Sequence, residues 1–173
     1  MKLPTLSAVA FLAALLIAPA SSAQEPPEPG PELDVLKKME GKWDTVMKVA
    51  GAESKGTYTS KMGVGGMWLV GDMEGELFGA KFVGKSLESY DAAKKKYVSI
   101  WVDSRAGAAV MMEGTHDKEK QTMTLAGEGP GMDGKPTKYR SVTTMKDDDS
   151  IEMTMYTGDA KEPTFTIAYK RKK

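Results

Sequence analysis

The feature that most constrains this chain is a series of short apolar or aromatic runs that begins at Gly41 and returns about every ten residues. Clusters of Gly, Asp, Lys and Pro separate the runs. Short strands at such regular spacing are typical of an all-β sandwich or barrel. Closing an up-and-down meander into a barrel leaves no unpaired edge strand. We therefore predict an all-β fold, an antiparallel up-and-down β-barrel of about ten strands with one short N-terminal helix.

The predicted elements follow one another with short turns between them. A helix is predicted over 32–40, where apolar residues recur every third position between Pro31 and Gly41. One adjacent pair of strands, around Phe78 to Leu87, has a single bent strand as its alternative. The strands are predicted near 42–49, 56–62, 67–74, 76–83, 85–90, 97–103, 108–114, 121–126, 137–146, 151–156 and 164–171.

The first residues predict export. A positive start at Lys2, an apolar run over 6–17 and small residues up to Ala23 are typical of a signal peptide that is cleaved after Ala23. The run is shorter than the roughly 20 residues of a membrane-spanning helix. We predict a cleaved signal peptide at 1–23, a Pro-rich linker at 24–31 and a single domain at 32–173. The mature protein is expected in the periplasm or outside the cell, without stable membrane insertion.

The composition removes several classes of function. The chain has no cysteine, so it has neither a disulfide nor a thiol nucleophile. Its 24 basic and 24 acidic side chains balance, which gives no electrostatic case for binding nucleic acid or an anionic membrane. A metal site built from several imidazoles is excluded, because His116 is the only histidine. We expect no metal and no cofactor, and the oligomeric state stays open.

Several patterns that suggest chemistry have simpler interpretations. His116 lies beside a charged turn, so we expect it to be exposed, whereas a haem ligand would have to lie inside a cavity. Residues 129–136 have phosphate-loop spacing but end in proline before a predicted strand, which indicates a hairpin loop. The run Asp147–Asp149 lacks the spacing of a calcium loop and is expected to be a turn. A glycosidase pair would require Asp103 and Glu113 to face one cleft. We name no catalytic residue.

Other residues favour a binding cavity. The chain has 13 methionines, whose flexible side chains suit irregular apolar ligands, although filling a core is the simpler explanation for them. Arg140 lies in the middle of a predicted strand and would hold a ligand carboxylate if it faced inward, its alternative being an outward position in water. The residues predicted to face a cavity are Trp101, Asp103, Arg140, Met153 and Met155.

The predicted strand 97–103 leaves one choice open. Successive side chains of a strand point to opposite faces, so only one of its two sets points inward. One register gives a plain aliphatic interior, and the other gives a cavity lined by aromatic and polar groups. The two sets are Val98, Ile100 and Val102 on one face, and Tyr97, Ser99, Trp101 and Asp103 on the other.

The tripeptide Gly41-Lys42-Trp43, directly after the predicted helix, resembles the G-x-W signature of the calycin superfamily, which includes lipocalins and fatty-acid-binding proteins. In that superfamily the tryptophan closes the base of the barrel, and a basic side chain of the last strand lies across its ring in a cation–π contact. The resemblance implies that Gly41, Trp43 and Arg171 close the barrel here, with Lys170 as the alternative to Arg171.

A closer resemblance covers nearly the whole predicted mature chain, which begins at Gln24. It is similar to an exported bacterial family known as domain of unknown function 1579. The matching segments are LKKMEGKWD at 36–44, GVGGMWLV at 63–70, the hairpin 89–104 and IAYKR at 167–171. The chain departs from the family's usual tyrosine around 114–117. The family has no assigned activity, so the resemblance implies a fold and export but no mechanism.

Together, these features favour an exported, non-catalytic protein that binds a small hydrophobic or amphipathic molecule in a barrel cavity. The alternative is a structural or interaction module of the cell envelope, with a filled core and no ligand. A third alternative is an uncharacterised hydrolase. Inward side chains that filled the barrel would exclude the binding protein.

Overall fold

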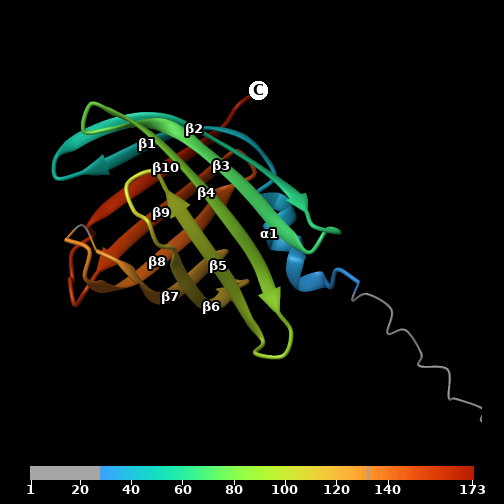
Figure 1. Ribbon diagram of the computed structural model, residues 1–173. Coiled ribbons are helices and arrows are strands. Elements are labelled where there is room, and N and C mark those ends of the chain that lie inside the picture. Colours follow the sequence, from blue (N-terminus) through green and yellow to red (C-terminus); the bar gives the residue numbers. More distant parts are fainter. Residues whose placement is uncertain (1–27, 132) are drawn as a thin grey trace, which may run out of the picture.

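The computed structural model describes residues 28–131 and 133–173, so the predicted signal peptide and the first half of the predicted linker lie outside the described residues. Ten antiparallel strands close into a barrel (Figure 1). Each strand pairs with its neighbours in sequence, and β10 pairs with β1 to complete the ring. This confirms the predicted ten-stranded up-and-down barrel with one short N-terminal helix.

The secondary structure begins with two short helical pieces and continues as strands. The 3-10 turn η1 covers Pro31–Leu33, and α1 covers Asp34–Lys38. The strands are β1 (Gly41–Val49), β2 (Ala52–Gly63), β3 (Trp68–Leu77), β4 (Ala80–Asp91), β5 (Lys96–Asp103), β6 (Val110–Asp117), β7 (Thr122–Pro130), β8 (Pro136–Asp147), β9 (Ser150–Thr157) and β10 (Phe165–Arg171).

One predicted strand, at 76–83, does not exist as a separate element. Phe78 and Gly79 form a tight turn there, with φ angles of 54° and 77°. β3 therefore ends at Leu77, and β4 runs without interruption from Ala80 to Asp91. The helical segment is also shorter than the predicted 32–40 and starts as a 3-10 turn.

Strand β5 directs its odd-numbered side chains into the barrel. Tyr97 and Ser99 are buried, and Trp101 and Asp103 line the interior. Val102 is 43% exposed on the outer face. The barrel thus encloses the aromatic and polar face of this strand, which answers the choice that its alternating pattern left open.

The helical segment closes one end of the barrel (Figure 1). Leu33 and Leu36 are buried and pack with Leu69 in one core cluster. Burial of each leucine contributes about 1.5–3 kcal/mol, so this small segment is firmly held. The opposite end carries the loops that follow β5 and β7, and we call it the mouth. No helix in the described part of the chain is both long and apolar enough to cross a membrane.

Candidate ligand-binding cavity

The barrel encloses a cavity of about 680 Å³ between the closed end and the mouth. Side chains from all ten strands contribute to its wall. Small-molecule sites in proteins commonly measure about 300–1,000 Å³. The inward side chains therefore do not fill the barrel, and the filled core of the structural-module alternative is not what this chain forms.

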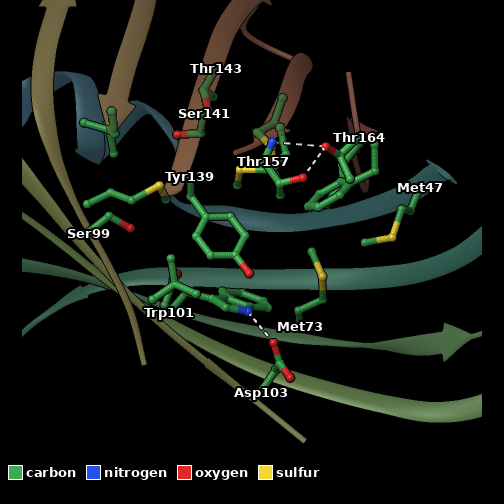
Figure 2. Close-up of a pocket in the computed structure, with 18 of the residues that line it drawn as sticks. Met47, Met73, Ser99, Trp101, Asp103, Tyr139, Ser141, Thr143, Thr157 and Thr164 are labelled. Carbon is green, nitrogen blue, oxygen red and sulfur yellow. Dashed lines mark hydrogen bonds between the residues drawn. The ribbon is translucent and has the colours of Figure 1, made fainter. Parts of the chain in front are cut away.

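The wall of the cavity is mainly apolar. Methionine is prominent, and its flexible thioether side chain adapts its shape to a neighbouring molecule. Aromatic rings from several strands complete the apolar surface, and Figure 2 shows Met47, Met73 and Trp101 directed into the same space. The methionines of the wall are Met39, Met47, Met73, Met112, Met123, Met153 and Met155.

Trp101 and Asp103 form a fixed pair near the mouth. The Trp101 Nε1–H donates to Asp103 Oδ2 over 2.7 Å (Figure 2), and the main-chain N–H of Arg105 donates to Asp103 Oδ1 over 2.7 Å. The indole stacks with Phe82, their ring centroids 6.3 Å apart. A Cβ at Gly84 would lie 2.4 Å from the indole, so the glycine makes room for it. The ring is thus oriented before any ligand arrives.

Hydroxyl groups surround the rest of the mouth. Tyr139 Oη donates to the main-chain oxygen of Pro130 over 2.6 Å. The hydroxyls of Thr157 and Thr164 lie 2.9 Å apart. Figure 2 shows the Tyr139 ring projecting into the space between these threonines and Trp101. The mouth therefore combines apolar surface with a few polar groups whose directions are set by the protein.

Glu88 is placed in the cavity far from the mouth. It pairs in register with Leu69 of β3, a core residue beneath the helical segment, and with Ser99 of β5. Within 28–131 and 133–173, its carboxylate has no hydrogen bond, and its oxygens are not enclosed by protein but open to the cavity. Burial raises the pKa of Glu88 from 4.5 to about 7, because a poorly solvated site disfavours the charged form.

Two tyrosines lie close enough to this carboxyl group to be affected by its charge. Tyr58 Oη and Ser86 Oγ share a hydrogen bond of 2.8 Å, and the rings of Tyr58 and Tyr169 pack edge to face with centroids 5.7 Å apart. Burial first, and then the nearby Glu88 charge, raise the pKa of both phenols above its ordinary value of 10. Both hydroxyls therefore stay protonated near neutral pH. We call Glu88, Ser86, Tyr58 and Tyr169 the Glu88 cluster.

Four of the five residues predicted to face a cavity line this one, namely Trp101, Asp103, Met153 and Met155. Arg140 does not. It is exposed on the outer face of β8, with its guanidinium carbon 3.7 Å from the centroid of the Tyr156 ring. The reason is the register of β8, which directs Tyr139 and Ser141 inward and the residue between them outward. Ligand contact by the other four stays a prediction.

Gly41, Trp43 and Arg171 meet at the closed end, in the arrangement that the calycin resemblance implied. Trp43 is 1% exposed, and its Nε1–H donates to the oxygen of Met39 over 3.1 Å. The Arg171 guanidinium carbon lies 4.1 Å from the centroid of the Trp43 ring, and its N–H groups donate to main-chain oxygens of α1 and of Glu40. Gly41 has a φ of 137°, and a Cβ there would lie 2.5 Å from Arg171 Nη1.

His116 is not the exposed turn residue that its neighbours in sequence suggest. It lies in β6, with its ring centroid 6.1 Å from that of Tyr97, and both ring nitrogens are buried without a hydrogen-bond partner in the described part of the chain. Burial is the main cause that lowers its pKa. The side chain does not contribute to the wall of the cavity. The described residues contain no group of three or more potential metal ligands.

Asp103 and Glu113 do not face one cleft. Asp103 lies inside the barrel, whereas Glu113 is on the outer face, where Lys94 Nζ lies 3.0 Å from its Oε2. The barrel wall separates the two carboxylates, so the glycosidase pair is ruled out.

The two other motif-like segments are connections, as predicted. The described residues between β7 and β8, Gly131 and 133–135, belong to a hairpin connection, where the Gly131 N–H donates to the Lys135 oxygen over 2.7 Å. The Asp147–Asp149 run lies at the turn between β8 and β9, and Asp147 Oδ1 accepts from the Asp149 N–H over 2.8 Å. Neither segment has the local structure of a phosphate or calcium loop.

The sequence did not single out the Glu88 cluster. Along β4, Glu88 alternates with aliphatic residues such as Val83 and Leu87, while Phe82 shares its own face. Both faces thus carry an apolar residue and a charged one, since Lys85 lies with the aliphatic set. Glu88, Ser86 and Phe82 are linked only by their even-numbered positions in the strand, and that alternation says nothing about which face is inside.

Comparisons with known proteins give a family and no function. No curated protein matches the chain. A de novo designed fluorescence-activating β-barrel is similar, with a TM-score of 0.45 and 12% identity over 77% of this chain and 93% of that one. A redesigned β-barrel has a TM-score of 0.44 and 13% identity over 85% of this chain and 100% of its own. The family model described as "Protein of unknown function (DUF1579)" matches residues 28–171. The chain therefore belongs to this family of unknown function.

Proposed function

We propose that this protein is an exported, non-catalytic binding protein that holds a small hydrophobic or amphipathic molecule inside its barrel. The observation that carries the proposal is the cavity of about 680 Å³, with a mainly apolar wall and polar groups at defined points. Such a wall favours an apolar guest, because each Å² of apolar surface that leaves water contributes about 25 cal/mol.

The order within the cavity also supports binding. Trp101 is held by Asp103 and stacks with Phe82, so a guest would not need to order this ring. Preorganisation of this kind lowers the entropic cost of association. The methionines of the wall retain the freedom to fit different shapes. A partly rigid and partly adaptable wall suits a guest of irregular outline.

The polar groups support binding rather than hydrolysis. A pKa near 7 would suit Glu88 for proton transfer. A hydrolase with a covalent intermediate would also need a nucleophile within hydrogen-bond reach of that base. Ser86 Oγ is instead bonded to Tyr58 Oη, and the Glu88 carboxyl has no bond to a hydroxyl in the described chain.

The proposal is tested on protein purified from its own host and examined by native mass spectrometry. We expect a guest in a one-to-one complex, released by organic extraction. Ser99→Phe adds a ring on the cavity face of β5 and should reduce guest occupancy severalfold. Ile100→Phe adds the same ring to the outer face of that strand and should not. A wild-type protein without a guest, or equal loss in both variants, would contradict the proposal.

Export is tested separately by the intact mass of the protein recovered from the periplasm or the medium. We expect a chain that starts at Gln24. Full-length protein that stays in the cytoplasm would contradict this part of the proposal.

A further inference from the structure

The charged groups of the cavity wall are distributed unevenly. In the described chain, the wall contains the charged side chains Glu88, Asp103, Arg105 and Asp133, and no lysine or histidine. Arg105 and Asp133 are exposed at the mouth, and Asp103 already accepts hydrogen bonds from Trp101 and from the main chain. The deep part of the cavity therefore carries one charged group, the Glu88 carboxylate.

Among residues 28–131 and 133–173, Glu88 has no partner of opposite charge. Its neighbours across the sheet are Leu69 and Ser99, and the titratable groups that face it from β2 and β10 are the phenols of Tyr58 and Tyr169. Buried charges in proteins are normally paired, because an isolated one loses its hydration without compensation. The raised pKa of Glu88 agrees with this lack of a cation. The carboxylate is open to the cavity, so a guest can supply what the protein does not.

We propose that the guest is an amphipathic amine, whose ammonium group pairs with Glu88 and whose apolar part extends along the methionines toward the mouth. This inference rests on the proposed binding function. An ammonium group has three donors. The Glu88 carboxylate accepts at least one, and the hydroxyls of Ser99 and Tyr169 are acceptors in the same region of the wall. The Tyr58 and Tyr169 rings add the electron-rich surface that favours a cation.

An anionic guest, such as a fatty acid, fits this distribution of charge poorly. Its head group would be repelled by Glu88 if it entered deeply. Arg140, which would hold a carboxylate from inside, lies on the outer face. Arg105 offers a cation only at the exposed mouth. The negative charge inside the barrel thus favours a guest with a positive charge.

The experiment compares decylamine, decanol and decanoate, which share one apolar chain and differ in the head group. Their affinities are measured at pH 8 by displacement of the fluorescent apolar probe N-phenylnaphthylamine from the wild-type protein. At that pH Glu88 is mainly ionised and the amine is protonated. We expect decylamine to bind about tenfold more tightly than decanol or decanoate.

Two substitutions locate the source of the preference. Glu88→Gln should lower the affinity for decylamine by about tenfold and leave the affinity for decanol within about twofold. Glu88→Leu, a second variant that also removes the charge, should behave in the same way. Glu128→Gln removes an exposed carboxylate from the outer face of β7 and should leave the order of affinities unchanged. Thermal melts check that each variant is folded.

The outcomes separate this inference from the function on which it rests. Equal affinities for decylamine and decanol in the wild type would contradict the inference that the guest is an amine. A preference for decylamine that survives both Glu88 substitutions would contradict it as well. In either case the protein would still be a binder of apolar molecules in general. Failure of the apolar probe and of all three compounds to bind would overturn the binding function itself.

Discussion

The closed end and the deep cavity of this barrel differ in how their polar groups are hydrogen-bonded. At the closed end, Trp43, Ser60 and Arg171 all donate to main-chain oxygens in or next to α1. In the cavity, the described chain provides no hydrogen bond for the Glu88 carboxyl or the Tyr169 hydroxyl. The pairing of these three donors stabilises this part of the closed end. Incomplete pairing costs stability and leaves groups ready for a guest.

The largest expected effect comes from removing the tryptophan of the closed end. Trp43→Ala removes a side chain that is only 1% exposed and should lower the free energy of unfolding by about 3–5 kcal/mol in urea titrations. Trp101→Ala is the matched change in the cavity wall. It should cost less than half as much, because one side of that ring already faces open space. Equal losses would contradict the contrast between the two regions.

The second expected effect is a gain in stability, caused by removing the Glu88 charge. The folded state raises the pKa of Glu88 from 4.5 to about 7, so between these values the folded protein holds more protons than the unfolded chain. Stability is therefore full below about pH 4.5 and falls as the pH rises through 7, by at most about 3 kcal/mol. Glu88→Gln should remove this loss and be more stable than the wild type at pH 8. Urea midpoints at pH 5 and pH 8 measure the difference, and parallel pH profiles for the two proteins would refute it.

A third comparison uses two arginines that both lie on aromatic rings. Arg171→Ala removes the cation from Trp43 together with its hydrogen bonds to main-chain oxygens, and should cost about 2 kcal/mol. Arg140→Ala removes an exposed cation from Tyr156 and should cost about 0.5 kcal/mol. Thermal and urea unfolding report both values. A larger loss at Arg140 would show that the hydrogen bonds at the closed end contribute little.

The smallest effect concerns single hydroxyl groups. Tyr97 Oη donates to the main-chain oxygen of Glu32 over 2.8 Å, so Tyr97→Phe should cost about 1 kcal/mol. Tyr169→Phe removes a hydroxyl without a partner in the described chain and should change the stability by only a few tenths of a kcal/mol. Both are measured by urea titration at pH 7. Losses of similar size would mean that the Tyr169 hydroxyl has a partner in solution.

Most strands were predictable because each depends on a local pattern of alternation bounded by turn residues. The prediction failed at 76–83, where Phe78 takes a positive φ in the turn between β3 and β4. Residues other than glycine rarely adopt that conformation, so the sequence pattern predicts that a phenylalanine there belongs to a strand. The closed end was predictable for a different reason. Gly41, Trp43 and the terminal basic cluster form a signature that can be recognised without the fold.

The candidate site was only partly predictable. Arg140 and Tyr139 are adjacent in sequence. The alternation of side chains along β8 places Tyr139 inside the barrel and Arg140 outside it. The same alternation in β4 places Glu88 inside, although its sequence neighbours resemble those of a surface carboxylate. Alternation predicts that two faces exist, but it does not say which face is enclosed when both carry apolar residues.

The amino-acid sequence alone was sufficient for the fold class and for most strands, and the resemblance to calycins implied a contact between Trp43 and Arg171 or Lys170. These properties follow from short-range patterns and from recognisable signatures. The sequence was not sufficient for the inner face of each strand or for the grouping of Glu88 with Tyr58 and Tyr169. Those follow from the closure of the ring, which sets the register of ten strands at once and brings together side chains from β2, β4 and β10.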